Sequence, residues 1–123
     1  MEKTNFEKLD VYKLSEQLSD VIWDIVIEWD YFAKDTVGKQ LVKSADSIGA
    51  NIAEGSGRGT DKDNIHFIKI SRGSLYETQH WLRRAYKRKL ITEKNIKQLL
   101  PTIKELAPRL NAYITSIERK NTK

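Results

Sequence analysis

The sequence has no cysteine, and it has only two prolines and six glycines in 123 residues. The lack of cysteine excludes disulfides, thiolate zinc sites and cysteine nucleophiles. The lack of cysteine also fits a reducing, cytoplasmic setting. The chain is long enough to bury a hydrophobic core without disulfides or bound metal. Because prolines and glycines are few and clustered, we expect long regular elements joined by short breaks.

Long hydrophobic runs are also missing. No charge-free stretch of the first periodic segment is longer than three residues, as at 25–27, whereas a membrane-spanning helix needs about 20 apolar residues. The first five residues are polar and contain no apolar signal region. We therefore expect a soluble cytoplasmic protein that does not contact a membrane.

Histidine is scarce, which limits the chemistry available to the chain. His66 and His80 are 14 residues apart, about 21 Å along a helix, and cannot share one metal ion. The pattern Gly55-x-Gly57-x-Gly59 follows a predicted helix instead of a strand and lacks phosphate-loop spacing. We interpret it as a helix-ending turn. The sequence predicts no catalytic residue, no metal site and no cofactor, and hence a protein that is not an enzyme.

What the sequence does have is helical periodicity. Apolar residues recur at steps of three and four in four segments, at approximately 9–30, 36–54, 61–89 and 93–119. The repeating residues are Leu14, Leu18, Val21, Ile22, Ile25 and Trp29; Leu41, Ala45, Ile48 and Ile52; Ile65, Ile68, Leu75, Leu82 and Tyr86; and Ile96, Leu99, Ile103, Leu106, Leu110, Tyr113 and Ile117. Four amphipathic helices with short connections predict an all-α fold, an antiparallel up-down-up-down four-helix bundle, over one domain of residues 1–123.

Polar residues mark the expected helix starts. Residues 31–35 form a predicted connection, after which Asp35 or Thr36 can cap the second helix. Thr60 is the predicted cap of the third helix, with acid following it, and Thr92 is the predicted cap of the fourth.

Proline and glycine inside the helical segments call for special geometry. Pro101 and Pro108 lie within the fourth helix, so we expect it to be curved or locally broken. Gly49 and Gly73 lie inside the second and third helices, where a glycine costs about 1 kcal/mol relative to alanine. Close packing of a neighbouring helix is the reason we expect for both.

Charge is divided unevenly along the chain. Residues 1–60 hold 7 Lys+Arg and 11 Asp+Glu, whereas residues 61–123 hold 15 and 6. The first helix carries an acidic stripe, consisting of Glu16, Asp20, Asp24 and Glu28. The third helix ends in a basic cluster, consisting of Arg83, Arg84, Lys87, Arg88 and Lys89. Such a division suits an anionic partner, a second copy of the chain, or simple solvation of two helical faces.

Three stretches of the sequence resemble one known family. Residues 47–58, Ser-Ile-Gly-Ala-Asn-Ile-Ala-Glu-Gly-Ser-Gly-Arg, resemble a motif of the four-helix-bundle proteins encoded in intervening sequences of bacterial 23S rRNA. Residues 6–12 and 67–78 resemble that family's opening segment and third-helix pattern, in the same order. The resemblance covers nearly the whole chain, although we do not associate the two prolines of the fourth helix with the family pattern.

The resemblance implies an antiparallel bundle that assembles into a ring-like homopentamer. The accessory variability determinant of diversity-generating retroelements, a relative, has this architecture, binds nucleic acid through a basic surface and partners a reverse transcriptase. For the motif residues Asn51, Glu54 and Arg58 in this chain, two interpretations remain: contact with a ligand or RNA, or contacts that tie the turn to neighbouring helices or subunits. We favour the second, and assign a structural role also to Gly55, Gly57 and Gly73.

Two functions follow as hypotheses. In the first, a homo-oligomer binds RNA through the basic cluster and Arg72, while Trp81 and Tyr86 could stack on unpaired bases. In the second, the chain is a scaffold or accessory subunit whose acidic and basic faces mediate ring assembly or binding of a protein partner. An enzyme has no supporting constellation of residues.

Overall fold

The computed structural model describes residues 5–121. Residues 1–4, part of the polar segment on which the predicted absence of a signal region rests, and residues 122–123 lie outside the described part of the chain. The described residues form helices joined by short turns, without any strand. None of these helices is long and apolar enough to cross a membrane.

The first helix is shorter than its sequence pattern predicts. A 3-10 turn, η1 (Phe6–Lys8), leads into α1 (Asp10–Val26). The predicted end near residue 30 is wrong because Asp30 caps the next element, accepting a hydrogen bond from the backbone N–H of Ala33 at 3.0 Å. The chain leaves the helix at Ile27 so that this carboxylate can reach the new helix start.

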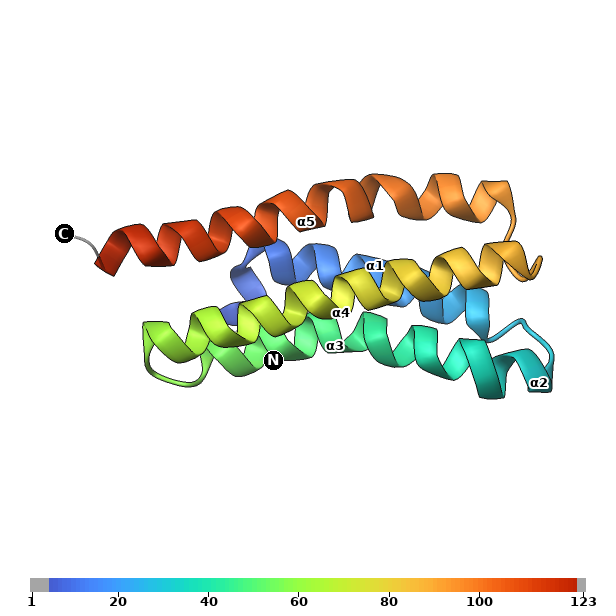
Figure 1. The fold of residues 1–123 in the computed structure, drawn as a ribbon, viewed down its shortest axis with the longest axis horizontal. Helices are drawn as coiled ribbons and strands as arrows, with labels where there is room; N and C mark the ends of the chain where they lie inside the picture. The colour runs from blue at the N-terminus through green and yellow to red at the C-terminus, as the bar shows by residue number, and fades with distance from the viewer. Residues whose placement is uncertain (1–4, 122–123) are drawn as a thin grey trace.

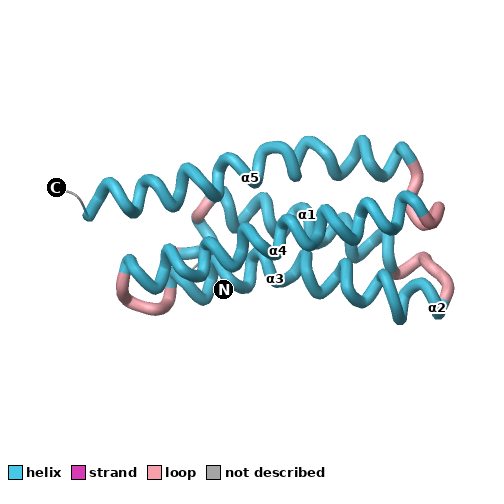
Figure 2. Tube along the Cα trace, in the orientation of Figure 1, coloured by secondary structure: helices cyan, strands magenta, loops and turns pink. Residues whose placement is uncertain are grey.

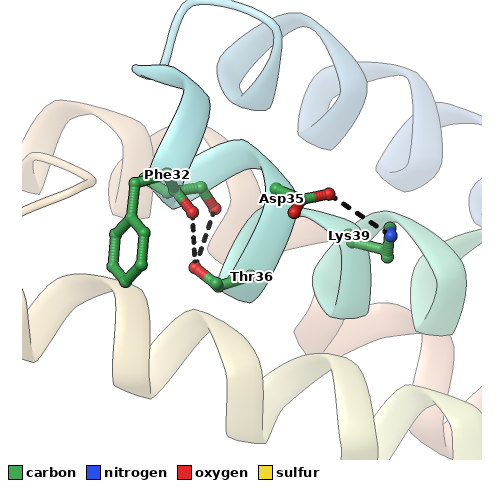
Figure 3. A network of polar contacts seen from close by, with 5 residues as sticks. Phe32, Asp35, Thr36 and Lys39 are labelled. Atoms are coloured by element: carbon green, nitrogen blue, oxygen red, sulfur yellow. Dashed lines mark hydrogen bonds and ion pairs between the residues drawn. The ribbon is translucent and has the colours of Figure 1, made fainter.

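The predicted connection at residues 31–35 is itself helical. The short helix α2 (Tyr31–Ala33) continues through a π-helical turn, η2 (Lys34–Gly38), into α3 (Lys39–Ser56). Neither Asp35 nor Thr36 caps this unit. The hydroxyl of Thr36 donates to the carbonyl of Phe32 at 2.7 Å, and Asp35 pairs with Lys39 at 3.3 Å (Figure 3). A π turn accommodates an extra residue within one continuous helix.

The other two helices begin at the predicted caps. The helix α4 (Asp61–Lys87) starts after Thr60, whose side chain accepts from the backbone N–H of Asp63 at 3.1 Å. The helix α5 (Glu93–Asn121) starts after Thr92. Here Thr92 accepts from the N–H of Asn95 at 3.1 Å and Asn95 accepts from the N–H of Thr92 at 2.9 Å. Both ends of this reciprocal cap are therefore satisfied.

The two prolines do not break α5. The helix runs without interruption past Pro101 and Pro108, as the trace in Figure 2 shows. Each proline removes a donor to the carbonyl four residues earlier, at Lys97 and Lys104. Both prolines are exposed and lie seven residues apart on the outer face of the helix. Water can therefore reach the carbonyls that the prolines leave without a helical donor.

The helices pack as a bundle in which each long helix has two neighbours. The helix α1 contacts α3 and α5, and α4 contacts the same two helices from the other side (Figure 1). The α3–α4 pair is the most extensive. The prediction of an all-α four-helix bundle is confirmed. The fully buried core includes Leu18, Ile22, Leu41, Ile48, Ile52, Ile68, Leu75, Leu99, Leu106 and Leu110.

Small hydroxyl residues complete the core between α3 and α4. The hydroxyl of Ser71 donates to the carbonyl of Ile48 at 2.8 Å. The hydroxyl of Thr78 lies 3.0 Å from that of Ser44 and donates to the carbonyl of Ser74 at 2.8 Å. Because these buried groups have partners, the polar atoms do not carry the cost of an unmet hydrogen bond.

The end of α4 adopts a Schellman turn with lysine in the position that favours glycine. Lys89 has φ of 63°. The N–H of Leu90 bonds the carbonyl of Ala85 at 2.9 Å, and that of Lys89 bonds Tyr86 at 3.0 Å. Lys89→Gly should therefore raise the free energy of unfolding by about 1 kcal/mol, since only glycine adopts this conformation without strain. Unfolding in urea measures this gain in stability. Lys89→Ala is the control: it removes the same charge but keeps the strained backbone conformation, so it should not raise the free energy of unfolding.

Candidate nucleic-acid interface

The predicted basic cluster lies at one end of the bundle. Arg83, Arg84 and Lys87 belong to the last turns of α4, Arg88 is its C-terminal cap, and Lys89 follows in the turn. Arg84 is half-buried and the other four side chains are exposed. The negative end of the α4 dipole favours cations here, but it is a partial charge of about one half and cannot neutralise five of them.

No residue of the basic cluster takes part in an ion pair within residues 5–121. The ion pairs found among the described residues include those of Lys39 with Asp35, Arg58 with Glu54, and Arg109 with Asp10 and Glu105. The acidic stripe of α1 is likewise exposed and contributes to none of these pairs. Residues 5–121 thus present two surfaces of opposite charge, and no ion pair among these residues neutralises either one.

Arg72 does not join the basic cluster. Its guanidinium donates to the side-chain carbonyl of Asn111 on α5 at 2.8 Å, and the side chain is half-buried. Arg72 and Arg83 are separated by 11 residues of α4, about 16 Å along the helix. The sequence-predicted RNA-binding residues therefore occupy two places, one at the helix end and one at the middle of the bundle.

The aromatic residues beside the cluster differ in their surroundings. Trp81 packs against the core, and its indole N–H donates to Glu77 at 3.1 Å. Tyr86 is 45% exposed and its hydroxyl donates to Glu93 at 3.3 Å. Tyr76, which was not predicted to bind RNA, is 55% exposed on the outer face of α4. Two tyrosine rings, and not the tryptophan, are open to a base on this helix.

The predicted close helix packing at Gly73 is wrong for this chain. Gly73 is exposed, and a Cβ atom built there would meet nothing within 4 Å. Gly49 behaves as predicted, because a Cβ there would come within 2.9 Å of the Ser15 hydroxyl on α1. Gly73 therefore leaves open space on the outer face of α4, next to Arg72 in sequence.

Gly73→Ala should stabilise the folded chain by about 0.5–1 kcal/mol, because alanine is the better helix former and the site is open. Equilibrium unfolding in urea measures this gain. Gly49→Ala is the matched control, and its crowded Cβ should lower stability. A loss of stability in Gly73→Ala would contradict the exposed position of this glycine.

The turn between α3 and α4 holds the motif residues in local contacts. Asn51 donates to the carbonyl of Ser47 at 2.8 Å, a bond that stays within α3. Glu54 pairs with Arg58 at 3.2 Å, and the Arg58 guanidinium lies 4.8 Å from the centre of the Phe67 ring on α4. The contacts of Glu54 and Arg58 tie the end of α3 to α4, in line with their structural interpretation.

The two central glycines of this motif have opposite surroundings. A Cβ at Gly55 would come within 2.8 Å of the Asn64 side-chain oxygen and 2.9 Å of Phe67 Cβ. Gly57 has no atom closer than 3.7 Å to such a Cβ. Gly55 therefore permits the close α3–α4 contact, whereas Gly57 lies in the open turn.

Among the described residues, no group of three or more side chains could bind a metal ion. His66 and His80 are both exposed and each lies against the neighbouring aromatic ring. Burial raises the pKa of Tyr12, and the charge of Glu16 adds to the effect.

An apolar groove between α4 and α5 was not predicted from the sequence. It has a volume of about 350 Å³ and is lined mainly by Leu82, Tyr86, Ile96, Leu99, Leu100 and Ile103. Arg83 and Lys97 lie at its rim. The only sequence signal was Leu100, which widens the apolar stripe of α5 beyond the buried positions and is 38% exposed.

Comparisons with known proteins agree with this architecture. Residues 7–112 match the family described as 23S rRNA-intervening sequence protein. A crystal structure of a protein of unknown function from the S23 ribosomal protein family of Bacteroides thetaiotaomicron superposes with a TM-score of 0.74. At 24% identity, the match covers 85% of this chain and 97% of that one, and shows a shared fold. No curated protein matches at a significant level. The chain belongs to the 23S rRNA-intervening sequence protein family.

Proposed function

We propose that this chain is a non-enzymatic, self-assembling protein that binds RNA through the basic cluster. The observation that carries the proposal is the set of five cations at the end of α4 without an ion-pair partner among residues 5–121. Lys and Arg side chains bind phosphates and release counterions from the nucleic acid. The family's name, which refers to 23S rRNA, makes RNA the first polyanion to test.

The chemistry of this surface favours backbone contact over base recognition. Phosphate contacts position a protein on nucleic acid but carry little sequence information. Tyr76 and Tyr86, both exposed, can add stacking on unpaired bases, which is tolerant of sequence. Several copies on one particle would sum weak individual contacts into useful affinity. By resemblance to the family, we propose five copies in a cytoplasmic ring.

Fluorescence anisotropy with labelled RNAs of equal length and unrelated sequence tests this proposal. We expect dissociation constants that agree within about threefold among the single-stranded RNAs, because the phosphates are the shared feature. Discrimination of more than about a hundredfold between sequences would contradict recognition by the backbone, as would the absence of binding at low salt.

A second candidate function is a protein-interaction scaffold, and the exposed acidic stripe of α1 favours it. In that case the basic cluster meets the acidic stripe of another copy or a protein partner. Reversing Asp20, Asp24 and Glu28 in one protein and the basic cluster in another should then abolish assembly separately and restore it on mixing. If the two variants fail to restore assembly together, this candidate falls.

A further inference from the structure

Two apolar surfaces remain open at the same end of the bundle. The first is an apolar knob, defined as Tyr31 and Phe32 on α2, whose side chains are 79% and 77% exposed. Figure 3 shows the Phe32 ring extending away from the helix that carries it. Side-by-side exposed aromatic residues at a helix start are costly in water and mark contact sites when they form a patch.

The second surface is the apolar groove between α4 and α5. Its wall is formed by leucine and isoleucine side chains, of which Leu100 is 38% exposed. Its volume of about 350 Å³ is comparable to the smaller pockets that receive ligands in proteins. A bulky apolar side chain suits such a space better than water does, because the groove has few polar groups to bond water.

The knob and groove of one molecule do not meet. Phe32 shares a hollow with Arg88 and Leu90, beside the turn that follows α4. The groove is lined by a separate set of residues, from Tyr86 and Glu93 towards Ile103, and shares none with that hollow. We infer that the apolar knob of one copy docks in the apolar groove of a second copy of this chain.

The charges around the two surfaces are complementary. The exposed acids Glu28 and Asp30 lie on the side of the knob that faces α1, while Lys34 follows the knob and Arg88 lies in the hollow beside Phe32. Arg83 and Lys97 are the cations that line the groove. Glu93, the one acid in the groove lining, accepts the Tyr86 hydroxyl at 3.3 Å. Docking with Glu28 and Asp30 turned towards Arg83 and Lys97 brings acid towards base, which fixes the orientation of the partner.

The contact is head-to-tail because it joins two different surfaces. The knob belongs to α2, and the groove is lined by residues of α4 and α5 on either side of their connecting turn. Figure 1 shows α2 and the α4–α5 turn at the same end of the bundle. When every copy makes this contact, neighbouring bundles point in the same direction. The copies close into a ring if the rotation between neighbours divides a full turn evenly. The inference rests on the self-assembly in the proposed function, but not on RNA binding.

Light scattering after size-exclusion chromatography, without RNA, tests the contact. The knob variant carries Tyr31→Ser and Phe32→Ser, and the groove variant carries Leu100→Glu, which places a charge in the apolar groove where the knob would dock. We expect the unaltered chain to form a multi-copy particle and each variant to be a monomer. Their equimolar mixture should give a dimer and nothing larger, because only one intact knob and one intact groove remain.

Tyr76→Ser is the control, since it removes an exposed aromatic residue from the outer face of α4 and should leave the particle mass unchanged. Circular dichroism checks that every variant is folded. A monomeric unaltered chain, or particles of unchanged mass in both variants, would overturn the inference. RNA binding by the monomeric knob variant, measured separately, keeps a failure of assembly distinguishable from a failure of RNA recognition.

The absence of cysteine allows a second test that does not depend on the groove variant folding. Phe32→Cys protein mixed with Leu100→Cys protein should form a disulfide-linked heterodimer under mild oxidation. Phe32→Cys mixed with Tyr76→Cys should not exceed the background of random collision. Equal cross-linking in the two mixtures would count against docking of the knob in the groove.

Discussion

Removal of four cations from the basic cluster should lower the affinity for single-stranded RNA by at least about a hundredfold at roughly 0.1 M salt. Each lost phosphate contact reduces the slope of log K against log salt by about 0.7, so four contacts reduce it by about 3. The variant carries Arg83→Gln, Arg84→Gln, Lys87→Gln and Arg88→Gln. Glutamine keeps much of each side chain's length while removing its charge. Anisotropy across a salt series measures both quantities.

A matched control separates the position of the charges from the net charge. Four other exposed cations lie on η1, α1 and α3, and their replacement changes the net charge by the same amount: Lys8→Gln, Lys13→Gln, Lys39→Gln and Lys43→Gln. This control should retain most of the affinity and most of the salt slope. If the two quadruple variants lose affinity equally, the interface is the whole surface and not the end of α4.

Gly55→Ala should lower the free energy of unfolding by about 1–2 kcal/mol. The new methyl group would meet the Asn64 side-chain oxygen at 2.8 Å, Phe67 Cβ at 2.9 Å and the Asn64 carbonyl oxygen at 3.1 Å. One of these atoms belongs to the backbone of α4, so α3 and α4 must move apart. Overpacking of this kind costs about 1–3 kcal/mol, and the better helix propensity of alanine returns up to about 1.

Thermal or urea unfolding measures this effect, with Gly57→Ala as the control. Gly57 has φ of −90°, and the atoms nearest to a methyl group at this position would lie 3.7 Å away, at an ordinary contact distance. Its substitution should change stability by less than about 0.5 kcal/mol. Equal effects at the two glycines would contradict the close α3–α4 contact. A lower RNA affinity in Gly55→Ala at full stability would instead favour the ligand interpretation of the motif.

The fold was largely predictable because three-and-four periodicity reports directly on burial. The stripe Leu41, Ala45, Ile48 and Ile52 is buried as predicted. On α1 the prediction was shifted, since Val11, Ser15 and Val26 are buried while Leu14, Val21 and Ile25 are only half-buried; Trp29, beyond the end of α1, is half-buried too. On α4, Tyr86 was placed in the core but is 45% exposed. Ser71 and Thr78, which interrupt the apolar pattern, are buried because each hydroxyl finds a partner.

Helix boundaries were harder to predict because several polar residues could cap the same helix. Asp30, Asp35 and Thr36 all precede apolar residues, and only the structure shows that Asp30 accepts the capping bond. Pro101 and Pro108 lower helix propensity, but their place on the exposed face lets α5 continue. The choice of capping residue and the continuity of α5 both depend on where these residues lie in the folded bundle, which the local sequence does not specify.

The candidate site was predictable in its charge but not in its shape. Five basic residues between positions 83 and 89 are visible in the sequence, and they do occupy one end of the bundle. Three features depend on how helices approach each other: the separation of Arg72 from the cluster, the open space above Gly73, and the apolar groove. The periodicity of apolar residues within one helix carries no information about the distance between that helix and its neighbour in the bundle.

The salt dependence of RNA binding by the unaltered chain tests the central claim most directly. With at least four phosphates contacted by the basic cluster, log K against log salt should fall with a slope of about −3 or steeper for single-stranded RNA. Binding that stays constant between about 50 and 300 mM salt, or no binding at about 50 mM, would show that the basic cluster does not serve as an RNA-binding surface.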